Sequence, residues 1–299
     1  MTTFLTVCRV MNYTKAAEEL HITQPAVSQH IHFLETHYGV KLFRYEGKSL
    51  RLTEAGRMLR NAATTIRHDE MLLAEQMKTS ARMRFSFGAT RTIGDYVLPE
   101  KLARYVLKNP DADVRMLVDK TETLLQKINA GELDCALIEG YFQKAEFESS
   151  VYSRERCIAV CGGEQPAGRQ PAGLADLFRE RLILREPGSG TREVLERHLK
   201  ERNCSVLDFA QVIEIGSIKA IKSLAAAGCG ITFLYEASVQ KELASGTLRE
   251  IPLADFEVYN YFNWVWRKNS LFGDRVLRIA GEILGERDPA GSGTEPDAF

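Results

Sequence analysis

Several features that mark secreted, redox-active or metal-binding proteins are missing from this sequence. The six cysteines are scattered and form no CxxC pair; they are Cys8, Cys135, Cys157, Cys161, Cys204 and Cys229. This pattern fits reduced thiols in a cytosolic protein, most of them packed in a core. Cys157 and Cys161, four residues apart, are the one pair for which we consider a redox role.

Long apolar runs are missing as well. No uninterrupted apolar stretch reaches the roughly 20 residues that span a bilayer, and the first ten residues, MTTFLTVCRV, show no secretory signal. We therefore expect a cytoplasmic protein without a membrane partner. The 299 residues, 44% of them hydrophobic, are enough for two or three packed domains.

Catalytic and metal-binding motifs are also absent. The GSG at 188–190 lacks the GxSxG spacing of a nucleophile elbow, and neither HExxH nor a cysteine-rich metal motif occurs. Five of the six histidines lie before residue 70, far along the chain from any other candidate site. We expect neither an enzyme nor a protein with a metal or a cofactor.

Charge is unevenly distributed, although the formal net charge is only −1. Residues 1–60 carry eight basic and five acidic side chains, so this segment is net +3 and the remainder is net −4. The histidines of the same segment add positive charge when they are protonated. A surface for nucleic acid must therefore be local to the N-terminal segment.

Two short helices are predicted at the start of the chain. Apolar residues recur at three- and four-residue steps in TTFLTVCRVM, which gives a first helix one buried face. In NYTKAAEELH, two adjacent alanines and Leu20 form the buried stripe of a second helix. Thr14 is a possible N-cap of that helix.

A third helix is predicted after a short turn. Thr23 is its expected N-cap, Pro25 lies in the first turn, where a missing N–H costs little, and Gly39 ends the helix. Its inward side consists of Val27, Ile31 and Leu34. Its opposite face is polar and nearly free of acid, and consists of Gln24, Pro25, Ser28, Gln29 and His32.

This arrangement of the second and third helices is typical of a helix-turn-helix that inserts one helix end into the major groove of double-stranded DNA. Gln and Ser side chains can bond base edges, and the positive helix end favours nearby phosphates. We predict that the polar face contacts bases and that Thr14, Lys15 and Thr23 contact phosphates. The alternative is an ordinary pair of helices with a solvated face.

The following segment, KLFRYEGKSLRLTEAG, predicts a β-ribbon. Alternating apolar residues flank a tight turn at Glu46-Gly47-Lys48. Arg44, Lys48 and Arg51 are expected to hold DNA phosphates, which fix register and make affinity fall with salt. Residues 1–58 are thus predicted to form an all-α winged helix-turn-helix with a ribbon as its wing.

The run NYTKAAEELHITQPAVSQHIHFLETHYGVKLF, followed by LRLTEAG, resembles the signature of LysR-type transcriptional regulators. The Ala-Ala, Gln-Pro-Ala-Val-Ser, Leu-Glu, Leu-Phe and Leu-Thr-x-Ala-Gly elements occur in order over roughly fifty residues. Tyr45 stands where the family usually has an arginine, with Arg44 one place earlier. The resemblance implies a sequence-specific regulator with an effector domain of two periplasmic-binding-protein-like lobes joined by crossover strands; RNA polymerase is a further partner that such a function allows.

Residues 53–80 predict a long linker helix with Thr53 as its N-cap and no proline. Its apolar stripe needs a partner, and a second copy of the helix is the simplest one. The resemblance favours dimerisation through this helix, with a tetramer as the larger assembly. The alternative is that the stripe packs on its own chain.

Beyond Arg82, short β-rich runs alternate with helical patterns, which predicts parallel sheets flanked by helices. We expect an α/β effector domain over 82–288, with one lobe at 82–161 and 267–288 and the other at 162–266. The tail 289–299, rich in Gly, Pro and acid, is expected to be disordered. The predicted strands are 85–89, 112–118, 135–139, 156–162, 181–186, 211–216, 230–234 and 259–266, and the predicted helices are 95–108, 121–130, 191–202, 217–227 and 273–284.

Three strand-to-helix junctions predict a site for a small anionic effector, because free N–H groups and the helix dipole favour an anion there. Hydroxyls can donate to it and arginines can pair with a carboxylate or phosphate. Plain helix capping is the alternative at each junction. The predicted effector residues are Thr90, Arg91 and Thr92, then Ser189, Gly190, Thr191 and Arg192, and finally Gly216 and Ser217.

The segment REPGSGTR, residues 185–192, is also similar to LysR-type members that govern carbon fixation and sulfur assimilation. That similarity implies a phosphorylated or carboxylated metabolite. The alternative function is a DNA-binding regulator without an effector, whose α/β lobes serve assembly only.

Overall fold

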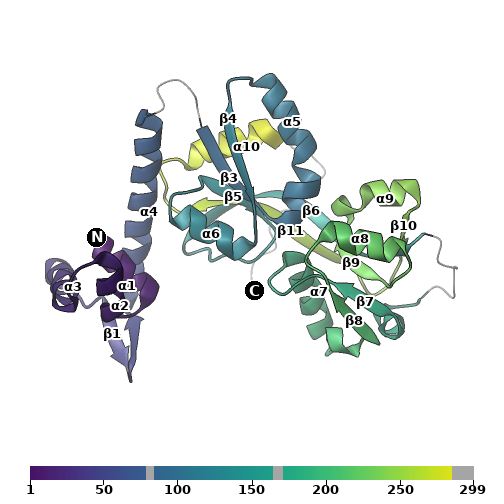
Figure 1. Ribbon diagram of the computed structural model, residues 1–299, viewed down its shortest axis with the longest axis horizontal. Helices are drawn as coiled ribbons and strands as arrows, with labels where there is room; N and C mark the ends of the chain where they lie inside the picture. The colour runs from purple at the N-terminus through teal and green to yellow at the C-terminus, as the bar shows by residue number, and fades with distance from the viewer. Residues whose placement is uncertain (79–83, 164–170, 285–299) are drawn as a thin grey trace.

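The computed structural model describes residues 1–78, 84–163 and 171–284. Figure 1 shows a small N-terminal domain, a long helix α4 (Glu54–Lys78) and two α/β lobes in a row. The predicted tail at 289–299 lies outside the described residues, as do the last two residues of the predicted linker helix.

The N-terminal domain is a winged helix-turn-helix, as predicted. It consists of α1 (Thr2–Val10), α2 (Tyr13–Leu20), α3 (Gln24–Tyr38) and a ribbon of β1 (Phe43–Glu46) and β2 (Ser49–Leu52). Phe4, Val7, Val27 and Leu42 are almost fully buried in its core. Burial of these apolar side chains is the main source of stability for so small a domain.

The helix ends follow the expected capping chemistry, with one correction. Thr23 caps α3 by accepting the backbone N–H of Ala26, and Gly39 ends that helix at a φ of 69°. The prediction that Thr14 caps α2 is wrong. The cap is Asn12, whose side chain accepts the N–H of Lys15, because only Asn12 has the extended backbone that precedes the helix.

One side of α4 packs on the first lobe of its own chain. His68 and Leu72 are buried on α4, and the Thr65 hydroxyl donates to the carbonyl of Lys268 at 3.0 Å. The alternative interpretation, in which the stripe packs on its own chain, thus describes one side of the helix.

Arg267 joins α4 to the first lobe. Its buried guanidinium donates to Thr65 Oγ1 at 3.0 Å, to the carbonyl of Asn61 at 2.9 Å and to Asn129 Oδ1 at 2.9 Å. It also lies 3.5 Å from the carboxylate of Glu146. Breaking a buried, hydrogen-bonded ion pair of this kind costs about 3–5 kcal/mol, so the contact fixes α4 on the lobe.

A mixed seven-stranded sheet runs through both lobes, in the order β10-β6-β11-β5-β3-β4 with β9 paired to β6. Its strands β3, β4 and β5 are parallel, whereas β6, β9, β10 and β11 pair antiparallel. The strands are β3 (Arg84–Ala89), β4 (Asp113–Val118), β5 (Cys135–Ile138), β6 (Phe147–Gly162), β9 (Thr232–Tyr235), β10 (Leu248–Ile251) and β11 (Val258–Arg267).

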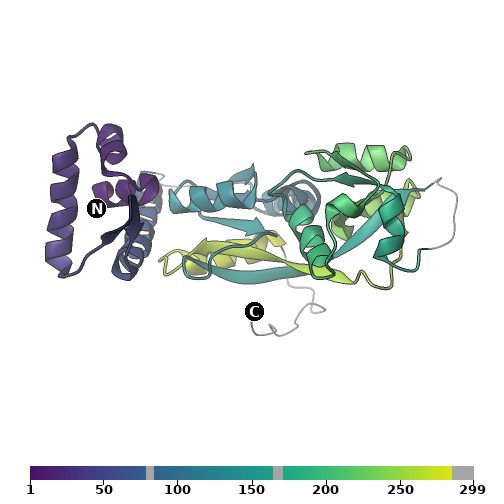
Figure 2. The ribbon, with the colours of Figure 1, turned by 90° about the horizontal axis from the view of Figure 1, so that it is seen from below.

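Helices cover this sheet and a second, two-stranded parallel sheet of β7 (Arg181–Leu184) and β8 (Gln211–Glu214). The first lobe contains the π-helix η1 (Ile93–Val97), α5 (Pro99–Lys108), α6 (Thr121–Asn129) and α10 (Gly273–Leu284). The second contains α7 (Gly190–Lys200), α8 (Ile218–Ala226), α9 (Gln240–Ser245) and the short 3₁₀ turns η2 (Leu174–Arg179), η3 (Val206–Asp208) and η4 (Glu236–Ser238). Figure 2 shows the two lobes side by side with β6 and β11 crossing between them.

The expectation of parallel sheets therefore needs correction, because the long crossover strands are antiparallel neighbours. Strand β6 begins at Phe147, nine residues before the predicted start. The prediction missed its first half because that half is polar and alternates in exposure. Strands β6 and β11 belong to both lobes, so the lobes divide within these strands rather than at 161–162 and 266–267. The β10 strand was not predicted.

The two cysteines considered for a redox role both lie on β6. Residues four apart on a strand are separated by about 13 Å, about twice the Cα distance that a disulfide allows. Both are buried, and burial raises the pKa of the Cys157 thiol to about 12. An intramolecular Cys157–Cys161 disulfide is therefore excluded, and neither thiol is activated.

Candidate DNA interface and effector site

Helix α3 lies at the outer end of the molecule, away from both lobes (Figures 1 and 2). Gln24, Pro25, Gln29 and His32 are exposed and Ser28 is half-buried, while the inward Val27 and Ile31 are buried. The Gln24 amide donates to Ser28 Oγ at 2.8 Å. This bond fixes two of the predicted base-contacting side chains relative to each other before any DNA arrives.

The predicted phosphate contacts have unequal surroundings. Thr14, Lys15 and Lys48 are exposed, whereas Thr23 uses its hydroxyl to cap α3. Arg44 and Arg51 face each other across the ribbon and share one carboxylate, that of Glu46, at 2.6 and 4.0 Å. A DNA phosphate at these arginines must therefore compete with Glu46, an effect that residue type alone did not reveal.

Glu35 joins α3 to the wing. Its carboxylate accepts the backbone N–H of Leu42 at 2.9 Å and lies 2.6 Å from Lys41 Nζ. Partial burial raises the pKa of Glu35, but the hydrogen bonds from Lys41 and Leu42 outweigh it and hold the pKa below its ordinary value. This structural role was not predicted, although the Leu-Glu element of the signature contains the residue.

Gly56 follows the wing at a position where close packing requires a glycine. A Cβ at this position would overlap the backbone carbonyl oxygen of Leu42, so only glycine lets α4 approach the ribbon this closely. The hydroxyl of Thr53 binds the same turn, accepting the N–H of Gly56 at 2.9 Å and donating to the carbonyl of Lys41 at 2.6 Å. The Thr-x-Ala-Gly spacing thus fixes the wing on α4.

Four predicted effector residues are buried at two strand-to-helix junctions, one in each lobe. Thr90 and Thr92 follow β3 in the first lobe, and Ser189 and Thr191 lie at the start of α7 in the second. Each is at most 5% exposed. The hydroxyls of Thr90, Ser189 and Thr191 have no hydrogen-bond partner among the described residues. We call these four residues the hydroxyl cluster.

Capping does not account for the hydroxyl cluster. Ser189 occupies the N-cap position of α7, yet its side chain makes no capping hydrogen bond, and neither does that of Thr92 before η1. Ser217, in contrast, caps α8 by accepting the N–H of Ala220 at 3.3 Å. The alternative of plain capping therefore applies to Ser217 and fails at Ser189 and Thr92. Buried hydroxyls without partners are costly and need an explanation.

A buried carboxylate, not predicted from the sequence, contacts both junctions of the hydroxyl cluster. Glu139 follows β5, and its Oε1 lies 3.5 Å from Thr92 Oγ1 while Oε2 has no partner among the described residues. A Cβ built on Gly190 would lie 2.5 Å from Glu139 Cγ, so the first residue of α7 rests directly on this side chain. Burial raises the pKa of Glu139 to about 7.

The remaining predicted effector residues lie around the cluster or are engaged elsewhere. Arg192 is bound to Glu196 at 2.7 Å and to Glu214 at 2.8 Å, so its guanidinium already has two carboxylate partners. Arg91, Gly216 and Ser217 are exposed. Arg185, which was not predicted, is buried near Glu139 and keeps Nη1 without a partner among the described residues, while its other nitrogens hold Glu186.

A cavity of about 520 Å³ opens beside the cluster, between α6 and the turn before α7. Tyr141, Gly188 and Glu193, which lie close to cluster residues along the chain, line it, but none of the nine predicted effector residues does. Lys120 bridges the lobes at its edge by donating to the carbonyl of Pro187 at 3.2 Å. We place the site at the cluster because the buried, unpartnered polar groups are there, and regard the cavity as the adjoining open space.

Comparison with known proteins identifies the family. Residues 1–57 match the model of the bacterial regulatory helix-turn-helix protein, lysR family, and residues 78–283 match the LysR substrate binding domain. The chain belongs to the LysR family. This finding confirms the prediction of a DNA-binding transcriptional regulator with an effector-binding domain, and it excludes an enzyme.

Two relatives of this LysR-family chain are named as transcriptional regulators. The HTH-type transcriptional regulator CfxR of Cupriavidus necator is 33% identical over 84% of this chain and 78% of its own length. The RuBisCO operon transcriptional regulator of Allochromatium vinosum is 29% identical over 93% of this chain and 91% of its own. The predicted similarity to regulators of carbon fixation is thus confirmed.

A solved structure shares the fold of the lobes. The regulatory domain of Synechocystis PCC6803 CcmR, in complex with 2-PG, superposes with a TM-score of 0.60 at 21% identity. The match covers 67% of this chain and 95% of that domain. At this level of identity it supports the two-lobed fold only.

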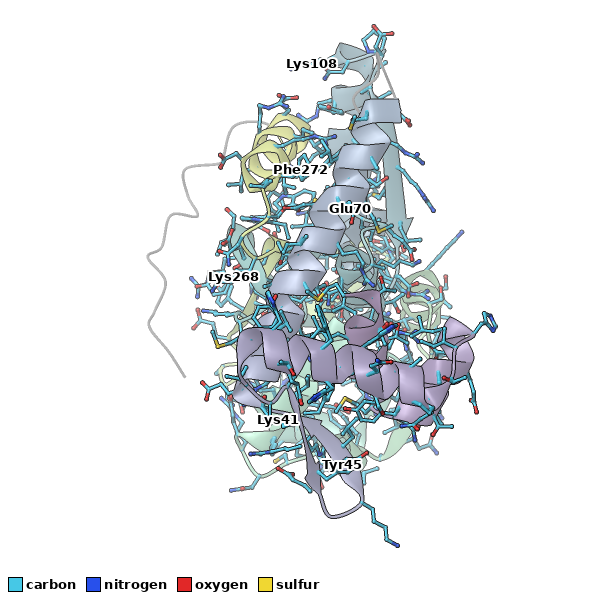
Figure 3. All side chains as sticks on the ribbon, turned by 90° about the vertical axis from the view of Figure 1, so that its left-hand side faces the viewer. Lys41, Tyr45, Glu70, Lys108, Lys268 and Phe272 are labelled. Carbon is cyan, nitrogen blue, oxygen red and sulfur yellow. The ribbon has the colours of Figure 1, made fainter. Side chains whose placement is uncertain are left out.

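The outer side of α4 in this LysR-family chain is not covered by the other described residues. Figure 3 looks onto that side, with Glu70 on the helix, Lys268 and Phe272 beside it and Tyr45 on the wing below. Met58, Ile66, Leu73 and Met77 recur along α4 at steps of four, seven or eight, and each is at least half exposed. An exposed apolar stripe of this kind marks an interaction surface.

Metal-binding clusters and membrane-spanning helices are both absent from the described parts of the chain. No group of three or more metal-binding side chains occurs there. No helix there is long and apolar enough to cross a membrane.

Proposed function

We propose that this regulator binds a small anionic metabolite in the hydroxyl cluster and contacts the bases of its operator with the polar face of α3. The alternative, in which the lobes serve assembly only, does not explain why the hydroxyls of Thr90, Ser189 and Thr191 are buried without partners among the described residues. This burial is the observation that carries the proposal.

Three features of the cluster suit an anion. The free N–H groups and the dipole at the start of α7 favour negative charge. The hydroxyls can donate hydrogen bonds, and Arg185, which is close enough to Glu139 to influence its charge, keeps one nitrogen without a partner among the described residues. The 2-PG bound by CcmR and the RuBisCO operon regulated by a relative make a phosphorylated or carboxylated acid of carbon metabolism the first class to test.

We further propose that two copies associate through the outer stripe of α4. The stripe is apolar, continuous over most of the helix and not covered by the described parts of this chain. A dimer places two α3 helices at separated half-sites, as operators with two-fold symmetry require. A tetramer needs a second interface, for which the lobes are the remaining surface.

Thermal unfolding in the presence of inorganic phosphate, sulfate, 2-phosphoglycolate and shikimate tests the effector site. A ligand that binds only the folded state raises the unfolding midpoint, and the shift grows with the logarithm of the ligand concentration once that concentration exceeds Kd. We expect at least one anion to stabilise the wild type, Thr191→Val to reduce that shift, and the capping variant Ser217→Ala to retain it. No shift with any anion would favour the assembly-only alternative.

A further inference from the structure

The carboxylate of Glu139 occupies the place where an anion is expected. It is buried against Gly190, the first residue of α7, with the hydroxyl of Thr92 at 3.5 Å from one oxygen. The other oxygen has no partner among the described residues. The site therefore holds a negative group of the protein at the helix end that attracts a negative ligand.

Two negative charges cannot share this position without a large cost. Charges 4 Å apart repel by about 4 kcal/mol even at the effective dielectric constant of 20 that suits protein sites. Carboxylates forced into one site respond by holding a proton, which removes the repulsion. A neutral carboxyl also gains an O–H donor that an anion can accept.

We propose that the effector anion binds only when Glu139 is neutral, so that binding takes up one proton and the Glu139 O–H donates a hydrogen bond to the anion. This inference rests on the proposed effector site and specifies its regulation. The proton comes from solvent, or from the ligand when the ligand carries one. The regulator then responds to the acidity of its surroundings as well as to the metabolite.

The charged and titratable groups around Glu139 come from four elements. Arg185 follows β7 and favours the ionised form, whereas Glu193 on α7 disfavours it. Tyr235 on β9 and Cys157 on β6 stay neutral near pH 7, since burial and the charge of Glu139 raise both pKa values. Asn260 on β11 donates to the backbone carbonyl of Glu139 at 2.7 Å and fixes its position.

Burial is the largest influence and raises the pKa of Glu139 to about 7, despite the nearby Arg185 guanidinium. The ionised and neutral forms are therefore both populated in the free protein near neutral pH. A small change in pH then changes the fraction of protein that can accept the anion.

The test compares sulfate binding by wild type and Glu139→Gln between pH 6 and 8.5, because sulfate does not titrate in this range. Wild type should bind sulfate about 30-fold more weakly at pH 8.5 than at pH 6, as linkage to a group with a pKa of about 7 requires. Glu139→Gln, which keeps the shape without the charge, should vary less than about threefold. If sulfate does not bind, 2-phosphoglycolate serves, since its own ionisation affects both proteins equally.

Glu186→Gln is the matched control. It removes a carboxylate next to the site, and the Arg185 guanidinium holds the pKa of that carboxylate low despite partial burial. The variant should therefore change the sulfate affinity by the same factor at every pH and keep the pH dependence of the wild type. Calorimetry of the wild type in two buffers of different ionisation enthalpy counts the protons directly. About one proton should be taken up at pH 8.5, and this measurement needs no variant.

The outcomes separate the two proposals. Binding that has the same pH dependence in wild type and Glu139→Gln, or wild-type binding that strengthens as pH rises, overturns the proton-coupled site and leaves the effector site standing. Absence of binding by any anion at any pH overturns both.

Discussion

The two candidate sites of this regulator are built in opposite ways. The proposed base-contacting face of α3 comes from one exposed helix, and its five side chains lie within nine consecutive residues. The hydroxyl cluster comes from the segment after β3 and from the start of α7, about a hundred residues apart in the chain, and it is buried. The first site adds little cost to folding, whereas the second buries polar groups that reduce stability until a ligand satisfies them.

Carboxylates show the same contrast. Partial burial opposes ionisation of Glu35 near the DNA-binding face, but hydrogen bonds from Lys41 and Leu42 prevail and lower its pKa. Burial raises the pKa of Glu139 in the effector site. Glu35 has its hydrogen-bond partners within its own domain, whereas Glu139 can change its charge near neutral pH.

The largest expected effect is on base recognition. Replacing Ser28 and Gln29 together with alanine should reduce the ratio of operator to nonspecific affinity by roughly 100-fold, since each good base contact contributes about 1–3 kcal/mol. A gel-shift competition measures the ratio. Thr36→Ala, near the far end of α3, is the control and should behave as wild type. Unchanged selectivity in the double variant would mean that another face contacts the bases.

The next largest effect concerns the stability of the lobes. The folded pKa of Glu139 exceeds its ordinary value of 4.5, so the folded lobes hold this proton more strongly and lose stability as pH rises from 4.5 to about 7. Glu139→Gln should remove that loss and be more stable than wild type by up to about 3 kcal/mol at pH 8.5. At pH 4.5 the two should be nearly equal.

Tryptophan fluorescence during urea unfolding measures this difference. Both tryptophans of the chain, Trp264 and Trp266, are buried on β11, so the signal reports on the α/β lobes and not on the N-terminal domain. A difference that is constant between pH 4.5 and 8.5 would contradict the assignment.

A smaller effect is expected where the wing meets α4. Gly56→Ala forces a methyl group onto the carbonyl of Leu42 and should destabilise the N-terminal domain by about 1–3 kcal/mol. Hydrogen exchange of the ribbon amides should accelerate while the lobes stay protected. Gly281→Ala on α10, where an added Cβ meets no other atom within 4 Å, is the control for the same substitution in a helix.

The smallest effect is expected for Glu35→Gln, which removes the ion pair with Lys41 but keeps an acceptor for Leu42 N–H. It should cost the N-terminal domain about 1 kcal/mol at pH 7. Because the folded pKa is lowered, this contribution is present above pH 4.5 and is lost as pH falls further. Circular dichroism of the helical signal at pH 7 and pH 3.5 checks it; a difference that grows on acidification would contradict this sign.

Local patterns predicted the elements whose signals are local. The helix at 273–284 matches α10, and Thr23 and Gly39 were identified as the ends of α3 from capping chemistry alone. The first half of β6 and the β10 strand were not predicted. Their polar, partly exposed sequences gain a strand conformation only from pairing with distant β11 and β6.

The effector site shows the same limit. Sequence placed Thr90, Thr92, Ser189 and Thr191 at strand-to-helix junctions. The structure buries all four, and Glu139 contacts one junction at Thr92 and the other at Gly190. The sequence could not show that Ser189 leaves its helix uncapped, or that Glu139 lies against Gly190, because both depend on how two lobes meet. Arg192 was predicted from its residue type, but two nearby glutamates engage it.

Arg267 has a mechanical consequence for any signal that passes along this chain. Its buried guanidinium holds the Thr65 hydroxyl and the Asn61 carbonyl, so α4 and the first lobe behave as one lever. The same hydrogen bonds do not reach the second lobe, which is joined to the first through β6 and β11. If a ligand at the proposed effector site moves one lobe relative to the other, α4 should therefore keep its place on the first lobe, and the position of the second lobe should change.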